Sequence, residues 1–183
     1  MKAWHFAKDD KRLGYGDGRE IIVGETLKHD GGLVLCSSGL HASIRPIDAL
    51  GYARGAYVCR VELGGEIIRS SDKAVASERT VIWAYNAAGV LRRFARLCAL
   101  DVIDKWDAPE IVVRYLKTGD ESIRDAAGDA AWDAAGAAAR DAAGDAARAA
   151  ARAAARDAAG AAARDKYNTM LEERVLEAWE DAQ

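Results

Sequence analysis

The chain has 183 residues, three cysteines and a formal net charge of −3. This length suits one domain with an appendage, and the near-neutral charge gives no general attraction to nucleic acid or to an anionic membrane. No apolar stretch is long enough to span a bilayer, and because charged residues follow Phe6 we expect no secretory signal peptide. The odd number of cysteines, each in an apolar run, indicates reduced thiols and therefore a cytoplasmic protein.

The first 85 residues predict short strands separated by turns. Segment 56–63 alternates between apolar and polar side chains, as a half-buried strand does. Gly64 and Gly65 predict a two-residue hairpin turn, and Pro46 predicts the first turn of a short helix over 46–52. The predicted strands are 3–6, 20–23, 33–36, 56–63, 66–68 and 80–83.

From residue 86 the pattern is helical. Apolar residues recur at spacings of three and four from Val90 to Val102. Asp107-Ala108-Pro109 ends that helix and begins another, which Gly119 terminates. Strands followed by helices predict an α+β fold with a small mixed or antiparallel sheet, and we expect residues 1–120 to form a compact domain.

Residues 121–166 form an alanine-rich arm built from tetrapeptides. Between Arg124 and Asp165 there is no Leu, Ile, Val, Met or Phe. Alanine favours helix, but a period of four drifts by about 40° per repeat around a helix of 3.6 residues per turn, so no fixed apolar face results. The arm is one long helix, or it breaks at some of its glycines (128, 136, 144 and 160), or it packs closely on another helix.

The arm and the tail carry the residues that we expect to bind a protein partner or a second copy. Arginines four residues apart form a basic ridge, and Asp125, Asp129 and Asp133 form an acidic one. Residues 167–183 predict an amphipathic helix that docks on this chain's own domain or on a partner. The predicted partner-binding residues are Trp132, Arg148, Arg152, Arg156 and Trp179.

The sequence has few groups arranged for chemistry. The spacing of His5, Cys36, His41 and Cys59 lacks the signature of a zinc site, so we expect no metal. Nothing in the sequence marks Cys36 as an activated thiol beside His41. The glycines at 14, 16 and 18 precede a predicted strand rather than a helix, which favours a turn over a dinucleotide-binding loop.

His5 lies on the first predicted strand, the motif Gly39-Leu40-His41-Ala42-Ser43 follows, and Glu78 precedes a later strand. In these features residues 3–85 resemble ADP-ribosyltransferase-like domains. This resemblance implies binding of NAD or a related nucleotide by His5, His41 and Ser43, with His5, Ser43 and Glu78 as the catalytic set. Thr80 replaces the second carboxylate of that family, which implies weak catalysis. The alternative is that His5 and His41 are ordinary half-buried histidines.

The whole chain resembles an uncharacterised family found in phages and GC-rich bacteria. The shared motifs are Lys-Ala-Trp-His-Phe, Leu-Gly-Tyr-Gly-Asp-Gly-Arg, Gly-Leu-His-Ala-Ser and the alanine-rich tetrapeptides. This resemblance implies no activity, although small phage proteins often bind host defence or replication complexes, which would place the protein in the host cytoplasm. We therefore expect a non-enzymatic protein that binds a partner or self-assembles, without a cofactor; the alternative is a nucleotide-binding domain.

Overall fold

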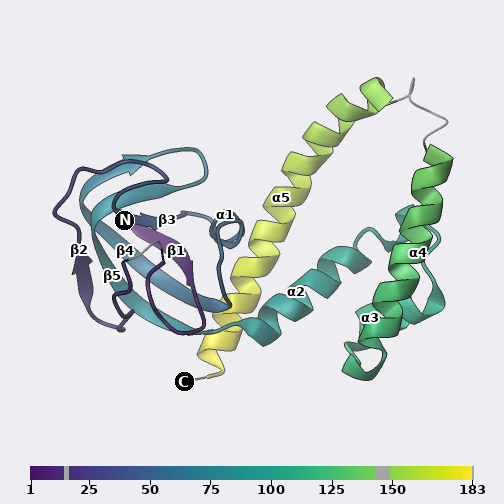
Figure 1. Cartoon of the computed structure of the whole chain (residues 1–183), viewed down its shortest axis with the longest axis horizontal. Coiled ribbons are helices and arrows are strands. Elements are labelled where there is room, and N and C mark those ends of the chain that lie inside the picture. Colours follow the sequence, from purple (N-terminus) through teal and green to yellow (C-terminus); the bar gives the residue numbers. More distant parts are fainter. Residues whose placement is uncertain (15–16, 143–148, 183) are drawn as a thin grey trace. The chain divides into compact units, whose positions relative to one another are not determined.

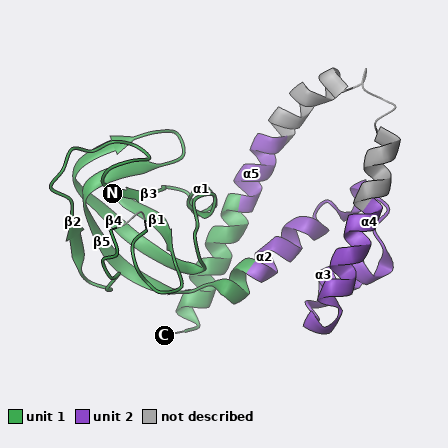
Figure 2. Cartoon of the chain, viewed as in Figure 1, with its two compact units in different colours: residues 1–91, 168–183 green, residues 92–167 purple. Residues whose placement is uncertain are grey.

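The computed structural model describes residues 1–14, 17–142 and 149–182, and the side chains among them that lie outside 135–159. The chain divides into two compact units (Figures 1 and 2). Unit 1 contains Met1–Leu91 and Asn168–Gln183, and unit 2 contains Arg92–Tyr167. Composition defined the boundaries of the predicted segments 1–120, 121–166 and 167–183, whereas contacts between residues define these two units. An antiparallel sheet with helices confirms the α+β class.

The sheet of unit 1 curls back on itself. Its antiparallel order is β1-β4-β5-β2, and β3 pairs with β5. Trp4 and Ser43 exchange two backbone hydrogen bonds, with N···O distances of 2.7 and 2.9 Å, so β3 also joins β1. An apolar interior results, enclosed by β1, β4, β5 and β3. The strands are β1 (Lys2–Ala7), β2 (Thr26–Lys28), β3 (Leu40–Ala42), β4 (Tyr57–Arg69) and β5 (Ala74–Asn86).

A bulge in β5 changes which side chains face the interior. Val81 lies opposite Val61 of β4, and Trp83 lies opposite the neighbouring Arg60, so Ile82 is an extra residue without an opposite partner. Val81 belongs to the buried core before the bulge. After it, Trp83 lies on the outer face of the sheet. One strand therefore supplies both the interior and an outer aromatic surface.

The C-terminal end of α5 (Ala149–Glu180) covers that outer surface (Figure 1). The Trp179 ring stacks on Trp83, with centroids 4.9 Å apart and planes at 15°. The Tyr85 hydroxyl donates a hydrogen bond of 2.9 Å to the carbonyl of Val175, and Leu171 and Val175 are fully buried. The predicted segment 167–183 is helical to Glu180 as the last part of the continuous α5, and this part docks on the chain's own sheet.

Unit 2 is helical. Asp101, just past α2, accepts hydrogen bonds from Lys166 and from the Tyr167 hydroxyl of α5. Helix α3 ends at Gly119, whose φ of 68° is the predicted left-handed terminus. Helix α1 (Pro46–Leu50) belongs to unit 1 and begins with proline as predicted. The remaining helices are α2 (Ala88–Leu100), η1 (Ile103–Lys105), α3 (Glu110–Thr118), η2 (Glu121–Ile123) and α4 (Arg124–Ala142).

The alanine-rich arm is helical wherever its backbone is described. Helix α4 continues through Gly128 and Gly136, and α5 continues through Gly160, so none of these glycines breaks a helix. Gly144 and Arg148 lie outside the described residues, as do the side chains of Arg152 and Arg156.

Two predicted strands are wrong. Segment 20–23 is irregular and forms one bridge, from Glu20 to Arg12. Ile22 and Val23 are 43% and 52% exposed, so their apolar character does not reflect burial between strands. Segment 33–36 enters a tight turn, in which the Ser38 amide donates to the Val34 carbonyl at 2.9 Å.

The predicted hairpin turn at Gly64–Gly65 is also wrong. Strand β4 continues to Arg69, and the pair lies at a register shift between Gly64 and Ile67. Gly65 has φ of 64°, and a Cβ there would lie 2.1 Å from the Ser77 Oγ, so this glycine is required by the bulge rather than by a turn. The turn between the strands spans residues 70–73, where the Ser70 amide donates to the Lys73 carbonyl at 2.8 Å.

We expect Trp179→Ala to destabilise unit 1 by about 2–3 kcal/mol, because it removes the ring that covers Trp83. Urea unfolding followed by circular dichroism measures this change. Trp132→Ala is the matched control: Trp132 is 80% exposed, so its loss should change the free energy of unfolding by less than about 0.5 kcal/mol. Equal effects of the two substitutions would contradict the docking of α5.

Candidate ligand-binding site

Unit 1 contains a cavity of about 440 Å³. Its walls come from β1 and β3, from the loops on either side of these strands, from the C-terminal side of α1 and from Arg79 of β5. The pairing of β1 with β3 assembles this site, because it brings residues 4–8 beside residues 36–43.

Three of the predicted ligand-binding residues line the cavity. His5 comes from β1, His41 from β3, and Ser43 follows β3 directly. Glu78 is not among the lining residues: its carboxylate forms an ion pair of 3.0 Å with Lys28 of the neighbouring β2. The structure therefore brings His5, His41 and Ser43 together but leaves Glu78 apart from them.

Arg79 is the residue that the sequence analysis missed. It is only 2% exposed, and its Nη1 donates a hydrogen bond of 2.6 Å to the carbonyl of His41. Its Nε is buried without a hydrogen-bond partner among the described residues. Burial lowers the pKa of the guanidinium to about 10. Strand alternation could have predicted this position. Arg79 lies two residues before the buried Val81, so both side chains face the same side of β5, whereas Glu78 faces the other side.

Two of the three histidines that line the cavity, His5 and His41, are held neutral. Burial, followed by the positive charge of Arg79, holds the pKa of His5 well below its ordinary value of 6.5. Burial also lowers the pKa of His41. The His41 Nε2 accepts the Cys36 amide at 2.9 Å, and Nδ1 lies 3.1 Å from the Gly39 carbonyl. We therefore assign the proton of the neutral His41 ring to Nδ1.

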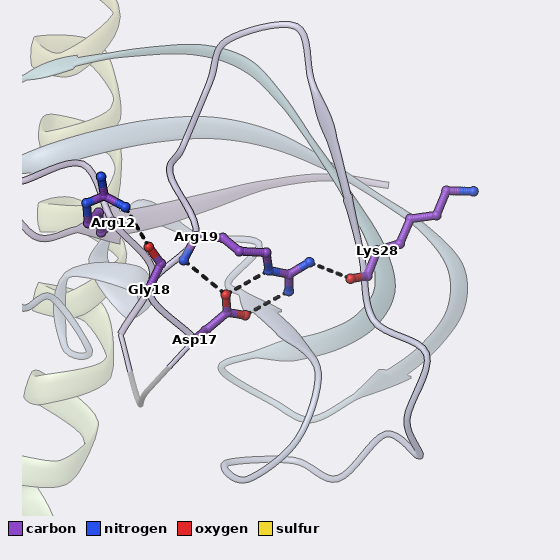
Figure 3. Close-up of polar contacts among 5 residues, drawn as sticks. All are labelled: Arg12, Asp17, Gly18, Arg19 and Lys28. Atoms are coloured by element: carbon purple, nitrogen blue, oxygen red, sulfur yellow. Dashed lines mark hydrogen bonds and ion pairs between the residues drawn. The ribbon is translucent and has the colours of Figure 1, made fainter.

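Polar contacts hold the segment around Asp17, which lines the cavity (Figure 3). The Arg19 Nε and Nη2 each donate to one carboxylate oxygen of Asp17 at 2.7 Å, and Nη1 donates to the Lys28 carbonyl at 2.7 Å. Arg12 donates to the Gly18 carbonyl at 2.9 Å. The hydrogen bond from Arg19 lowers the pKa of Asp17. The one carboxylate of the cavity lining is therefore already neutralised by Arg19.

The charged residues of the lining are mostly cationic. Arg79 forms no ion pair within the described part of the chain. A buried positive charge is costly unless an anion or a set of hydrogen bonds compensates it. The site is therefore suited to an anionic ligand. The cations are Lys8, Arg12, Arg54, Lys73 and Arg79, and the one acidic residue is Asp17.

The described residues hold neither a cluster of metal ligands nor a membrane-spanning helix. Across 1–14, 17–142 and 149–182, no three His, Cys, Asp or Glu side chains cluster as metal ligands would. None of the helices in these ranges combines the length and apolar character needed to cross a bilayer.

The fold and the cavity define an α+β protein with a cationic internal site. The chain belongs to the family described as Domain of unknown function (DUF7666), whose model matches residues 1–93. The predicted membership of an uncharacterised family is thereby supported. Comparison with curated proteins and with solved structures gives no match. The matched segment ends within α2, whereas unit 1 also includes Asn168–Gln183.

We expect stability to fall as the pH drops from 7.5 to 5.5. Because the folded pKa of His5 lies below 6.5, the unfolded chain binds the proton first, so stability is complete above about pH 6.5 and is lost below it. The limiting slope is about 1.4 kcal/mol per pH unit for each such histidine.

Urea unfolding at several pH values measures this slope. His5→Gln should reduce it, and His5→Gln with His41→Gln should nearly abolish it, because the pKa of each ring is lowered in the folded state. The depressed Asp pKa values act at lower pH and do not contribute in this window. An unchanged slope in the double variant would refute the neutral, buried state of the rings.

Proposed function

We propose that the cavity binds a small phosphorylated ligand of the nucleotide class, such as ADP-ribose or NAD, without transferring ADP-ribose. The observation that carries this proposal is the buried guanidinium of Arg79, which has an unpartnered Nε and no ion pair in the described chain. A phosphate group would supply both the missing charge and the missing hydrogen-bond acceptor.

The rest of the lining supports the same class of ligand. Arg12 and Lys73 add positive charge, and the Ser43 hydroxyl and the neutral His5 and His41 rings can exchange hydrogen bonds with a sugar or a base. A volume of about 440 Å³ lies in the range of pockets that hold small organic ligands.

The positions of Glu78, a predicted catalytic residue, and of Thr80 on β5 favour binding over transfer. Glu78 is paired with Lys28 at 3.0 Å. Thr80, at the place of the family's second carboxylate, forms a hydrogen bond of 2.7 Å with the Thr26 hydroxyl of β2. Without a carboxylate from β5 in the lining, no group of this strand stabilises the positive charge that develops on ribose during transfer.

The test replaces Arg79 with methionine, which has a similar length and no charge. Removing an uncompensated buried charge should leave the ligand-free protein as stable as wild type or more stable, while the thermal stabilisation by ADP-ribose should be lost. Wild-type protein in about 1 mM ADP-ribose should gain several degrees in melting temperature. Arg92→Met, at an exposed position in unit 2, is the control and should retain the full shift.

Three further probes define the ligand class. Inorganic phosphate should give a smaller shift than ADP-ribose, and ribose should give none. NAD should bind without being consumed, as followed by chromatography of the nucleotide. If neither ADP-ribose, NAD nor phosphate shifts the wild-type protein, or if Arg79→Met binds as wild type does, the proposal fails.

A second candidate function is self-association through the arm, which is favoured by Trp132. This ring is 80% exposed, and an adjacent groove of about 530 Å³ between α3 and α4 is lined by Val112, Tyr115 and Gly128. The chain also carries acidic positions 125, 129 and 133 and basic positions 148, 152 and 156 at the same four-residue spacing. A second copy therefore supplies both complementary charge and an apolar ring, and we propose it as the partner.

Sedimentation velocity at about 50 µM tests this, since a micromolar interface is occupied at that concentration. We expect a wild-type dimer that dissociates on Trp132→Ala and weakens in about 1 M NaCl. Val23→Ala, at a 52% exposed position of unit 1, is the matched control and should remain dimeric. A monomeric wild-type protein would exclude this candidate.

A further inference from the structure

Three large side chains form a row across the outer face of the sheet. Trp4 of β1 lies opposite Arg60 of β4, and Arg60 lies opposite Trp83 of β5. Residues directly opposite each other on neighbouring strands project from the same face of a sheet and contact each other. The outer row, Trp4–Arg60–Trp83, therefore connects β1, β4 and β5 through side chains as well as through the backbone.

The Trp4 ring is held within this row. It meets Trp83 edge-on, with centroids 5.6 Å apart and planes at 78°, and the Arg60 guanidinium lies 4.4 Å from its centre. Trp4 is fully buried. Because Trp179 of α5 stacks on Trp83 at 4.9 Å, the helix holds one of the two neighbours that hold Trp4.

The backbone of Trp4 also closes the cavity. Its amide and carbonyl exchange hydrogen bonds of 2.7 and 2.9 Å with Ser43, and both residues line the cavity. The next residue, His5, faces the opposite side of β1 and lines the cavity with its neighbours. Two hydrogen bonds contribute only modestly to stability, so the side chains that hold Trp4 in place also support this closure.

The end of α5 has the character of an element that docks and undocks. Its contact residues Leu171, Val175 and Trp179 are four positions apart on one side of the helix, and the Tyr85 hydroxyl adds a hydrogen bond of 2.9 Å to Val175. This end belongs to unit 1, whereas the preceding part of the helix belongs to unit 2 (Figure 2). A helix end held by a few side chains has two discrete states, and such an element can carry coupling between sites.

We propose that docking of α5 regulates ligand binding in the cavity, with Trp4 as the positioning residue that connects the two. Docked α5 holds Trp83, Trp83 holds the Trp4 ring, and the Trp4 backbone holds Ser43. Undocking loosens the closure of β1 onto β3 and weakens binding, and a bound ligand strengthens docking by the same factor. The part of this inference that concerns the ligand rests on the proposed function.

Amide hydrogen exchange of the ligand-free full chain, followed residue by residue by NMR, tests the first half of the coupling. Trp179→Ala should speed exchange of the Trp4 and Ser43 amides at least about fivefold. The His29 amide, which donates to Ser77 at 2.8 Å, lies beside β2 and serves as the internal control. Its rate should change by less than about twofold.

Isothermal titration with ADP-ribose tests the second half. Trp179→Ala should raise the Kd at least about fivefold, whereas Trp132→Ala, at an 80% exposed position, should leave it within about twofold. In the wild-type chain ADP-ribose should slow exchange of the amides of residues 171–179 by a similar factor, and this measurement needs no variant.

Two further variants separate positioning from general stability. Trp179→Phe retains a ring that can stack on Trp83 and should recover most of the loss in both measurements. Tyr85→Phe removes only the hydrogen bond to α5 and should reproduce the effects of Trp179→Ala to a smaller degree, which keeps the test decisive where Trp179→Ala does not fold.

The outcomes distinguish this inference from the proposed function. Equal acceleration of Trp4, Ser43 and His29 would indicate a loss of global stability alone and would overturn the coupling. Tight binding of ADP-ribose with the same Kd in folded Trp179→Ala would also overturn it, but would leave the proposed function standing. A wild-type chain that binds no ADP-ribose would refute the proposed function, and the ligand-free exchange rates would still decide whether α5 supports the closure.

Discussion

The guanidinium of Arg79 is a positive charge inside a curled sheet, and the charge balance of the cavity depends on it. It donates to the His41 carbonyl, so it links β5 to β3 through a side chain in addition to the backbone pairing. Its charge also lowers the pKa of His5, which keeps that ring neutral. Since Arg19 already neutralises Asp17, the interior keeps one uncompensated cation, and such a site favours an anion over water.

The bulge at Ile82 allows this polar interior to coexist with a well-packed exterior. Without an extra residue, alternation along β5 would place Arg79, Val81 and Trp83 on one face. With it, the arginine points inward and the tryptophan meets α5 on the outer face. The sheet therefore does not have to bury an indole and a guanidinium in the same small space.

Local sequence patterns predicted the fold well where the spacing of apolar side chains, or a residue that begins or ends a helix, determines the structure. The strand at 56–63, the proline at the start of α1, the left-handed Gly119 and the amphipathic tail all follow from such rules. Segments 20–23 and 33–36 were wrongly predicted as strands, because a short apolar run has the same composition in a strand as in a loop. For the site, His5, His41 and Ser43 were found through a motif, whereas Arg79 lies 38 positions after His41 and only the pairing of β3 with β5 brings the two residues together.

The places where the alanine-rich arm leaves and rejoins unit 1 explain its lack of large apolar side chains. The chain leaves unit 1 after Leu91 and returns at Asn168, so the arm lies within a connection rather than in a free tail. The large side chains that anchor the return to unit 1, Leu171, Val175 and Trp179, all follow the last tetrapeptide. Docking of the returning helix therefore does not require a large apolar residue between Arg124 and Asp165. A helix-forming tetrapeptide can repeat there even though its period of four residues gives the helix no constant apolar face. The family match ends at residue 93, yet Trp83, within the matched segment, is covered by Trp179 from beyond it. In this chain the arm therefore acts as the connection that carries the covering helix back to the domain.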